Sequence, residues 1–369
     1  MERTVTRRME KIRQRLESSE LEGLIVVGAE NRRYLSGFTG SNGWLLITGE
    51  LQLLVTDGRY WSQVEDQSPD WQIVRFKAQD HGRLSRILAQ RFQELGGSGR
   101  LGFEMDHISF AQHEQMEEDF AGIGLVPTSD LVEALRQVKD ADELERMRRA
   151  AAVADRAFLK MLEHFREGVR ESELCAELEY LLQKEGARKP AFDTIVASGP
   201  NGAYPHAGVT DRRIGRGELT TLDFGALVDG YASDITRTVW LGELPEPALT
   251  VHRVVRDAQR AALDAVRPGI SAAELDGVAR KIIEDAGYGE AFSHSLGHGI
   301  GLAVHEPPTL RSTTETVLEP GMVITIEPGI YLPGETGCRI EDTVLVTDSG
   351  FDSITRAPKQ EPGQPHPLD

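Results

Sequence analysis

The first third of the chain alternates helix-type and strand-type hydrophobic patterns. Residues 6–21 carry apolar side chains at helical spacing, which predicts an amphipathic helix, and residues 23–28 form a short apolar run typical of a buried strand. Further patterns of these two kinds occupy residues 44–47, 51–55, 82–95 and 101–103. Gly49 and Glu50 separate two of the strand-type runs and predict a turn there. The alternation indicates an α/β domain that ends in a connection near Pro127.

The rest of the chain contains a faint internal repeat. After a long helix predicted over residues 140–165, four residues recur at a constant offset: Gly168, Glu173, Leu174 and Gly186 return as Gly269, Glu274, Leu275 and Gly287. Any two helix-turn-helix stretches share a few residues, but the unbroken offset and the strand-type runs that follow favour duplication. A duplicated α+β unit would place its two sets of strands side by side, with a site between them.

The length of the chain favours two domains. At 369 residues it exceeds the usual span of one hydrophobic core, and 40% apolar residues suffice for substantial cores. We therefore predict an α+β protein with an α/β domain at residues 1–127 and a pseudo-two-fold α+β domain at residues 128–369.

Composition narrows the choice of partner and compartment. The net charge of −18 and the pI near 5.1 argue against nucleic acid and against an anionic membrane as partners. No run reaches the ~18 apolar residues of a membrane span, and the charged amino terminus lacks the apolar core of a signal peptide. Two cysteines, Cys175 and Cys338, form neither a disulfide framework nor a zinc cage. We expect a cytoplasmic protein.

Two aspartates flank a predicted hairpin in the first copy of the repeat. If Asp229 and Gly230 are the turn residues, position 223 falls opposite Thr236, and residue 234 lies on the same face. Asp223 and Asp234 are then diagonal neighbours with Cα atoms roughly 7–8 Å apart. Either aspartate alone would be explained more simply as an exposed turn or edge residue, but the shared face favours a metal site.

The second copy supplies two glutamates at strand ends. Glu327 ends the apolar strand pattern of residues 322–326, where an unpaired buried charge would be costly and metal coordination would offset the cost. Glu341 alternates with Arg339, so both side chains can face one side, and the guanidinium could orient a ligand oxygen. An exposed Arg-Glu ladder is the simpler alternative, but the neighbouring apolar strand disfavours it.

A histidine between glycines completes the candidate ligand set. His298 lies in Gly-His-Gly-Ile-Gly, where the flanking glycines allow close approach of the backbone. The run is not a dinucleotide loop because position 304 is valine. We expect His206, His294 and His305 to carry protons or bind substrate around the site, although any one of them alone would be structural. Four carboxylates and one imidazole favour Mn²⁺, Co²⁺ or Zn²⁺.

These segments resemble the pita-bread metallopeptidases, and within them the branch of Xaa-Pro aminopeptidases and prolidases. The resemblance rests on residues 223–225, 233–238, 297–302, 305–306, 326–331 and 339–342. Weaker matches at residues 31–40 and 57–60 resemble the creatinase-type amino-terminal domain of the same branch. The resemblance implies a creatinase-like N-terminal domain followed by a pita-bread catalytic domain.

The resemblance also implies roles for the candidate residues. Asp234 and Glu341 would contact both of two divalent ions, Asp223 would bind one, and His298 with Glu327 would complete the other. Glu327 would take the proton from a water that bridges the ions. His206, His294 and His305 would bind substrate or stabilise the tetrahedral intermediate, with support from Tyr331 and Arg339. Mn²⁺ is the expected metal, with Co²⁺ or Zn²⁺ as alternatives, and a homodimer or homotetramer is the expected assembly.

The expected function is a metal-dependent exopeptidase acting on peptides with proline at the second position. We place an Xaa-Pro aminopeptidase first and an Xaa-Pro dipeptidase, a prolidase, as the alternative. A non-catalytic binding protein on the same fold is the third hypothesis. The presence of all five candidate ligands argues against it, because a protein without catalysis does not need them. A metal-free amidinohydrolase like creatinase is disfavoured because it has no need of the complete carboxylate set.

Overall fold

The computed structural model describes residues 2–77, 79 and 82–362 and divides the chain into two compact units, Met1–Arg136 and Gln137–Asp369. The protein is a mixed α+β structure, as the hydrophobic pattern predicts. Among the described residues, no helix has both the length and the apolar character that crossing a membrane requires.

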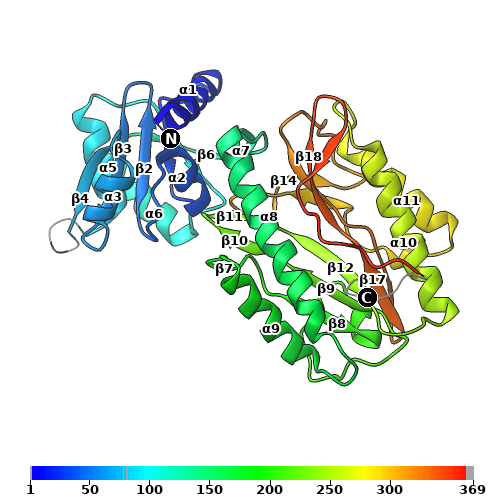
Figure 1. The fold of residues 1–369 in the computed structure, drawn as a ribbon. Helices are drawn as coiled ribbons and strands as arrows, with labels where there is room; N and C mark the ends of the chain where they lie inside the picture. The colour runs from blue at the N-terminus through cyan, green and yellow to red at the C-terminus, as the bar shows by residue number, and fades with distance from the viewer. Residues whose placement is uncertain (1, 78, 80–81, 363–369) are drawn as a thin grey trace. The chain divides into compact units, whose positions relative to one another are not determined.

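The first unit is built on a six-stranded mixed sheet with the order β4-β3-β2-β1-β5-β6 (Figure 1). Its strands are β1 Gly23–Val26, β2 Trp44–Thr48, β3 Gln52–Asp57, β4 Gln72–Phe76, β5 Arg100–Glu104 and β6 Gly124–Thr128. The pairs β1–β2 and β2–β3 are antiparallel, and β3–β4, β1–β5 and β5–β6 are parallel. All four residues of β1 are buried, because a central strand covered on both faces needs apolar side chains in both directions.

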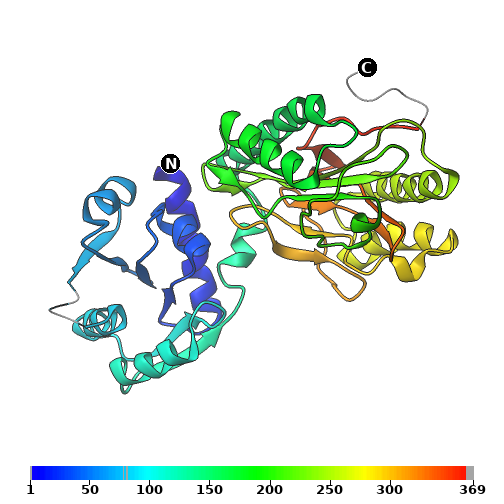
Figure 2. The same ribbon diagram turned by 90° about the horizontal axis from the view of Figure 1, so that it is seen from below.

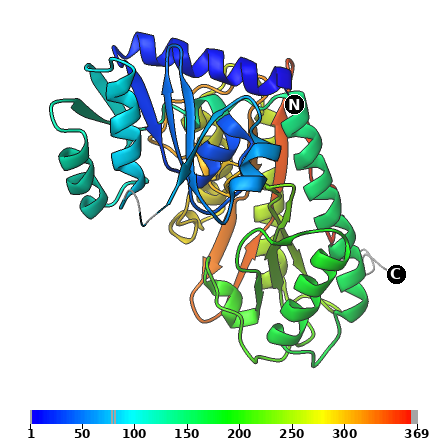
Figure 3. The same ribbon diagram turned by 90° about the vertical axis from the view of Figure 1, so that its left-hand side faces the viewer.

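Helices accompany this sheet. They are α1 Glu2–Ser18, α2 Ala29–Ser36, α3 Trp61–Gln67, α5 Leu84–Glu94, α6 Phe110–Asp119 and α7 Glu133–Arg136. Figure 3 shows α1, in dark blue, lying beside the blue strands. The helices predicted at residues 6–21 and 82–95 correspond to α1 and α5, each with shifted ends.

The connection predicted near Pro127 is instead the edge strand β6. Pro127 pairs with Phe103 of β5 in parallel register. Proline cannot donate a ladder hydrogen bond, so its place in a sheet is an edge strand, and β6 is the outer strand here. The first compact unit accordingly continues past residue 127 through α7 to Arg136.

The second unit contains strands between two pairs of helices, the green pair α8–α9 and the yellow pair α10–α11 (Figures 1 and 2). Its helices are α8 Ala141–Met161, α9 Glu171–Lys184, α10 Glu246–Ala265 and α11 Ala272–Asp285, with short 3₁₀ turns η1 Leu162–His164, η2 Gly199–Ala203 and η3 Gly289–Ala291. A capping box formed by Asp140 and Glu143 begins α8, in agreement with the helix predicted from residue 140.

The strands of the second unit form two related groups. In the first copy they are β7 Lys189–Pro190, β8 Ile195–Ser198, β9 Thr220–Phe224, β10 Ala226–Val228, β11 Tyr231–Ala232 and β12 Ile235–Val239. In the second copy they are β13 Gly297–Gly299, β14 Glu306–Leu310, β15 Val323–Ile326, β16 Gly329–Leu332, β17 Thr336–Arg339, β18 Asp342–Val346 and β19 Phe351–Ser353. The sheets have the orders β11-β10-β7, β12-β9-β8, β14-β13-β15-β18-β19 and β16-β17.

Each copy of the repeat has its own apolar core. Residues of α8 and α9 pack with β8, β9 and β12, whereas residues of α10 and α11 pack with β15, β17 and β18. The amphipathic pairs of helices thus bury one face each against their own strands. Strand ends that carry polar residues lie between the two cores.

The same turn is built before the second helix of both copies. Gly168 N donates to Ile214 O at 2.8 Å, and Gly269 N donates to Leu318 O at 2.9 Å. Both glycines have positive φ, 82° and 85°, a backbone conformation that side chains disfavour. The repeated glycines therefore mark a duplicated structural element, as the sequence predicts.

Candidate metal centre

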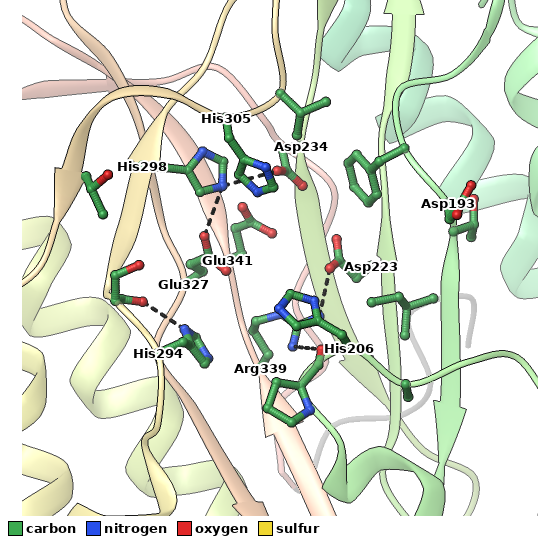
Figure 4. Close-up of a pocket in the computed structure, with 18 of the residues that line it drawn as sticks. Asp193, His206, Asp223, Asp234, His294, His298, His305, Glu327, Arg339 and Glu341 are labelled. Atoms are coloured by element: carbon green, nitrogen blue, oxygen red, sulfur yellow. Dashed lines mark hydrogen bonds and ion pairs between the residues drawn. The ribbon is translucent and has the colours of Figure 1, made fainter. Parts of the chain in front are cut away.

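Three carboxylates from the two copies converge in one place (Figure 4). Asp223 lies in β9, Asp234 directly precedes β12, and Glu341 lies between β17 and β18. Each offers an oxygen, and these three oxygens lie within 4.8 Å of one another. The predicted hairpin register is confirmed, because Val228 pairs with Tyr231 and Asp223 pairs with Thr236.

The other two candidate ligands complete the cluster. His298 in β13 places its Nε2 3.6 Å from Asp234 Oδ2 and 3.3 Å from Glu327 Oε1 (Figure 4). Glu327 directly follows β15. The five residues selected from the sequence therefore surround a single point between the two copies.

Glycines let the histidine strand approach its neighbours closely. A Cβ atom at Gly297 would lie 2.0 Å from the carbonyl oxygen of Thr325, and one at Gly299 would lie 2.3 Å from that of Pro307. The register between β13 and β14 shifts between His298 and Gly299, a bulge that re-aims the imidazole. The close approach expected for this run is confirmed.

Two threonines hold the ligands in place, and the sequence analysis gave neither of them a role. The Thr236 hydroxyl donates to Glu341 Oε2 at 2.7 Å, and the Thr325 hydroxyl donates to Glu327 Oε1 at 3.0 Å. Thr325 also accepts a hydrogen bond from the backbone N–H of His298 at 3.0 Å. A signal was available for Thr236, because the hairpin register already placed it opposite Asp223.

Arg339 acts on the opposite copy of the repeat. Its guanidinium donates to Asp223 Oδ2 at 2.7 Å, to the Tyr331 hydroxyl at 2.7 Å and to the backbone oxygen of Pro205 at 3.1 Å. Only 4% of Arg339 is exposed, which rules out the surface Arg-Glu ladder considered above. The expected contact with a ligand oxygen is present, and the oxygen belongs to Asp223, not to the neighbouring Glu341.

The three other histidines line a cavity of about 900 Å³ that contains all five candidate ligands. His294 Nε2 lies 2.9 Å from the Tyr331 hydroxyl, and the His305 ring packs edge-on against His298 with centroids 4.3 Å apart. His206 lines the same cavity (Figure 4). Apolar residues form another part of the cavity wall: Phe192, Ile195, Pro205, Val209, Val304 and Pro307.

Burial and mutual repulsion disfavour the ionised forms of three of the carboxylates in the metal-free protein. Burial, reinforced by the negative charges of neighbouring carboxylates, raises the pKa of both Asp234 and Glu341 well above their ordinary values. Burial also raises the pKa of Asp223, even though Arg339 acts in the opposite sense. Like charges at this spacing in a buried site disfavour ionisation.

The imidazole partly compensates this negative charge in the metal-free protein. Burial lowers the pKa of His298, but the hydrogen bond and charge of Glu327, together with the charge of Asp234, outweigh it and raise that pKa to about 9. Conversely, burial alone would raise the pKa of Glu327, but His298 outweighs it and lowers that pKa to about 2.

The donor set fits divalent metal ions. Among the described residues, neither Asp223 Oδ1 nor Glu341 Oε1 has a hydrogen-bond partner, although both atoms are buried. Orphaned carboxylate oxygens next to like charges are costly unless a cation binds there. Oxygen donors with one imidazole suit Mn²⁺, Co²⁺ or Zn²⁺.

We expect the protein to release protons from its ligand side chains when divalent ions bind at pH 7. With a pKa of about 9, His298 holds a proton at pH 7 in the metal-free protein, the raised pKa values of Asp234 and Glu341 favour their protonated forms, and ligation requires the deprotonated form of each. Calorimetry in two buffers of different protonation enthalpy measures the number released. Apparent metal affinity should rise about tenfold per pH unit for each proton. Binding without proton release, and with an affinity independent of pH, would contradict this electrostatic description.

Known families match both units of the chain. A model of metallopeptidase family M24 matches residues 145–348, and a model of the creatinase/prolidase N-terminal domain matches residues 8–138. An Xaa-Pro dipeptidase of Pyrococcus furiosus is 39% identical over 354 residues, covering 96% of this chain and 99% of the relative.

Two solved structures extend the comparison. An Xaa-Pro dipeptidase from Bacillus anthracis has a TM-score of 0.93 at 39% identity, covering 97% of this chain and 99% of that one. An X-Pro aminopeptidase from Thermotoga maritima has a TM-score of 0.85 at 36% identity, covering 95% and 98%. Both named activities hydrolyse a bond to proline. They differ in the length of the peptide that is cleaved.

Proposed function

Because the chain belongs to metallopeptidase family M24 and carries a creatinase/prolidase N-terminal domain, we propose that it hydrolyses Xaa-Pro dipeptides, the activity of a prolidase. From the sequence alone we expect the aminopeptidase first, whereas the similar proteins favour the dipeptidase. Relatives named Xaa-Pro dipeptidase from two Pyrococcus species each cover 96% of the chain. The aminopeptidase is the second candidate, because the similar structure from Thermotoga maritima is an X-Pro aminopeptidase.

The observation that carries the proposal is the convergence of four carboxylates and one imidazole in a single cavity. Bound divalent ions would activate a water molecule and polarise the scissile carbonyl group. We propose Mn²⁺, with Co²⁺ or Zn²⁺ as alternatives. Asp234 and Glu341 would be shared between two ions, with Asp223 on one side and His298 and Glu327 on the other. A non-catalytic protein would have no need of the complete set.

Glu327 is the proposed general base. Its carboxylate borders the cavity and, because its pKa is lowered to about 2, is ionised at neutral pH in the metal-free protein. One of its oxygens is fixed by the Thr325 hydroxyl, so the carboxylate has a defined direction. A positioned base of this kind takes the proton of the attacking water and delivers it to the leaving nitrogen.

The three histidines are proposed to bind the substrate or to stabilise the tetrahedral intermediate. His206 and His305 lie on the cavity wall, and His294 is oriented through the Tyr331 hydroxyl. Burial lowers the pKa of His294, which keeps it neutral near pH 7. Its single N–H, on Nδ1, donates to the backbone oxygen of Ser295 at 2.8 Å, so Nε2 accepts from the Tyr331 hydroxyl and fixes that hydroxyl beside the cavity. The apolar part of the wall, with Phe192 and Ile195, suits a proline ring.

Peptide length decides between the two candidates. We expect hydrolysis of an Xaa-Pro dipeptide by metal-loaded enzyme, and at least about tenfold lower kcat/KM for the tetrapeptide Xaa-Pro-Gly-Gly. An Xaa-Ala dipeptide is the matched control and should not be cleaved. Faster cleavage of the tetrapeptide would support the aminopeptidase. If neither proline peptide is cleaved, the proposed function is wrong.

We further propose a cytoplasmic homodimer or homotetramer, on the family resemblance alone. The acidity of the chain and its free cysteines, Cys175 and Cys338, are compatible with a reducing compartment. Light scattering on the purified protein measures the number of subunits.

A further inference from the structure

One fully buried carboxylate outside the metal centre gathers an unusual number of hydrogen bonds. Glu171, the first residue of α9, is 0% exposed. Its Oε1 accepts from both the backbone N–H and the hydroxyl of Ser198, each at 2.7 Å. Its Oε2 accepts from Asn201 Nδ2 at 2.8 Å and from Thr210, through the hydroxyl at 2.5 Å and the N–H at 3.2 Å. Five hydrogen bonds thus satisfy the two buried oxygens. The Arg212 guanidinium, which donates to the Ser198 hydroxyl at 2.6 Å, also interacts with the charge of Glu171.

These partners are the two ends of one segment. Ser198 ends β8, and residues 199–210, which we call the His206 loop, carry His206 to the cavity wall. Glu171 therefore joins the start of the His206 loop to its end. Midway, the backbone oxygen of Pro205 accepts from Arg339, so the loop is attached to the site at one further point. The backbone around His206 is thus held at both ends and beside the imidazole.

The internal repeat indicates that the fold alone does not require this carboxylate. Glu171 N donates to Arg212 O at 3.0 Å, and in the second copy Ala272 N donates to Thr316 O at 2.8 Å. Ala272 is as fully buried as Glu171. The same helix start and the same backbone bonds are thus formed with an alanine. The carboxylate is present only in the copy whose loop carries His206.

We propose that Glu171 is a positioning residue for the reaction: its buried carboxylate clamps the ends of the His206 loop and so sets the place of His206 in the cavity. The role in turnover depends on the function proposed above, whereas the clamp itself does not. A carboxylate suits this task because each of its oxygens accepts several hydrogen bonds, whereas a glutamine would aim an NH₂ group at donors.

The clamp can be tested without activity. In Glu171→Gln we expect the amide protons of Ser198 and Thr210 to exchange with solvent about tenfold faster or more, in the metal-free protein. Glu274→Gln is the matched control, because it replaces an exposed carboxylate in the first turn of the equivalent helix α11. Unchanged exchange at Ser198 and Thr210 would overturn the clamp, whatever the enzyme hydrolyses.

The positioning role is tested by a double-mutant cycle on metal-loaded enzyme of verified metal content. We expect Glu171→Gln to lower kcat by about 10- to 100-fold with a smaller change in KM. His206→Ala should keep its metal and lose activity, and adding Glu171→Gln to it should cost little more, because both act through one imidazole. Glu171→Asp, which keeps the acceptors, should recover part of kcat. If Glu171→Gln lowers kcat by the same factor in wild type and in His206→Ala, the proposal is overturned.

A milder variant guards against misfolding. Thr210→Val removes the hydroxyl that donates to Glu171 and accepts from the backbone N–H of Arg212, and leaves the carboxylate its other partners. It should shift exchange and kcat in the same direction as Glu171→Gln by smaller factors. Wild-type exchange and kcat in Thr210→Val, together with an unfolded Glu171→Gln, would show that Glu171 serves only the fold.

Discussion

Replacing Glu327 with glutamine is expected to lower kcat by roughly 10²–10⁴-fold while the protein stays folded and loaded with metal. The amide keeps an oxygen that can act as a ligand, but it cannot accept the proton of the attacking water. The adjacent apolar strand β15 and the hydrogen bond from Thr325 should keep the side chain in place. Steady-state kinetics on an Xaa-Pro peptide, with metal content measured on the same sample, gives the result.

The control for this experiment is Glu335→Gln. Glu335 is an exposed carboxylate between β16 and β17, and its replacement makes the same chemical change on the same copy of the repeat. Near-native kcat in Glu327→Gln at full metal content would remove Glu327 from the role of base. A large loss in the Glu335→Gln control would point instead to a general effect on the fold.

Replacing Asp234 with asparagine is expected to abolish stable metal binding. Asp234 is 5% exposed and lies close to His298, Asp223 and Glu341, so it occupies the centre of the candidate ligand set. Burial and the charges of its neighbours raise its pKa well above the ordinary value, so ionised Asp234 costs free energy in the metal-free protein. Asp234→Asn should therefore unfold at a higher temperature than wild type without metal, above pH 7.

Added metal should reverse this order. A ligand at 100 times its Kd stabilises the folded state by about 2.7 kcal/mol, and the variant should gain almost none of this. Thermal unfolding with and without Mn²⁺, and metal analysis after dialysis, measure both effects. Asp193→Asn is the control, because Asp193 lines the same cavity and lies outside the carboxylate cluster. Full metal retention by Asp234→Asn would contradict the proposed arrangement.

The order of the two Xaa-Pro activities shows a limit of the sequence. Both activities require the same ligands and the same base, so no motif in the second unit separates them. The two activities differ in how many residues of the substrate must be accommodated beyond proline, and the ligand set does not determine that number. Similar proteins favour the dipeptidase, and peptide length tests it directly.

Short helices with mixed patterns of polar and apolar residues could not be predicted from the sequence either. Helices α2 and α3 have eight and seven residues, and α2 buries Asn31 and Arg32 among its polar residues. Arg32 is buried because backbone oxygens of Val27, Gly40 and Gly43 accept its hydrogen bonds. A helix stabilised in this way lacks the apolar stripe by which helices are recognised.

The sequence by itself determined what is local. The turn pair Asp229-Gly230 and the two-residue period of a strand place Asp223 opposite Thr236, and the structure has this register. The glycines around His298 and the repeated turn glycines follow from backbone sterics in the same way. The hairpin register and the duplication could therefore be predicted from the chain alone.

Only the tertiary structure decided how the two copies meet. Arg339 and Asp223 are 116 residues apart, and Thr236 and Glu341 are 105 apart, yet each pair is joined by a hydrogen bond. The His206 clamp by Glu171 likewise depends on the path of a loop between elements. Periodicity reports which face a side chain takes within its own strand or helix. It does not report which distant backbone lies opposite, because the packing of whole cores sets that distance.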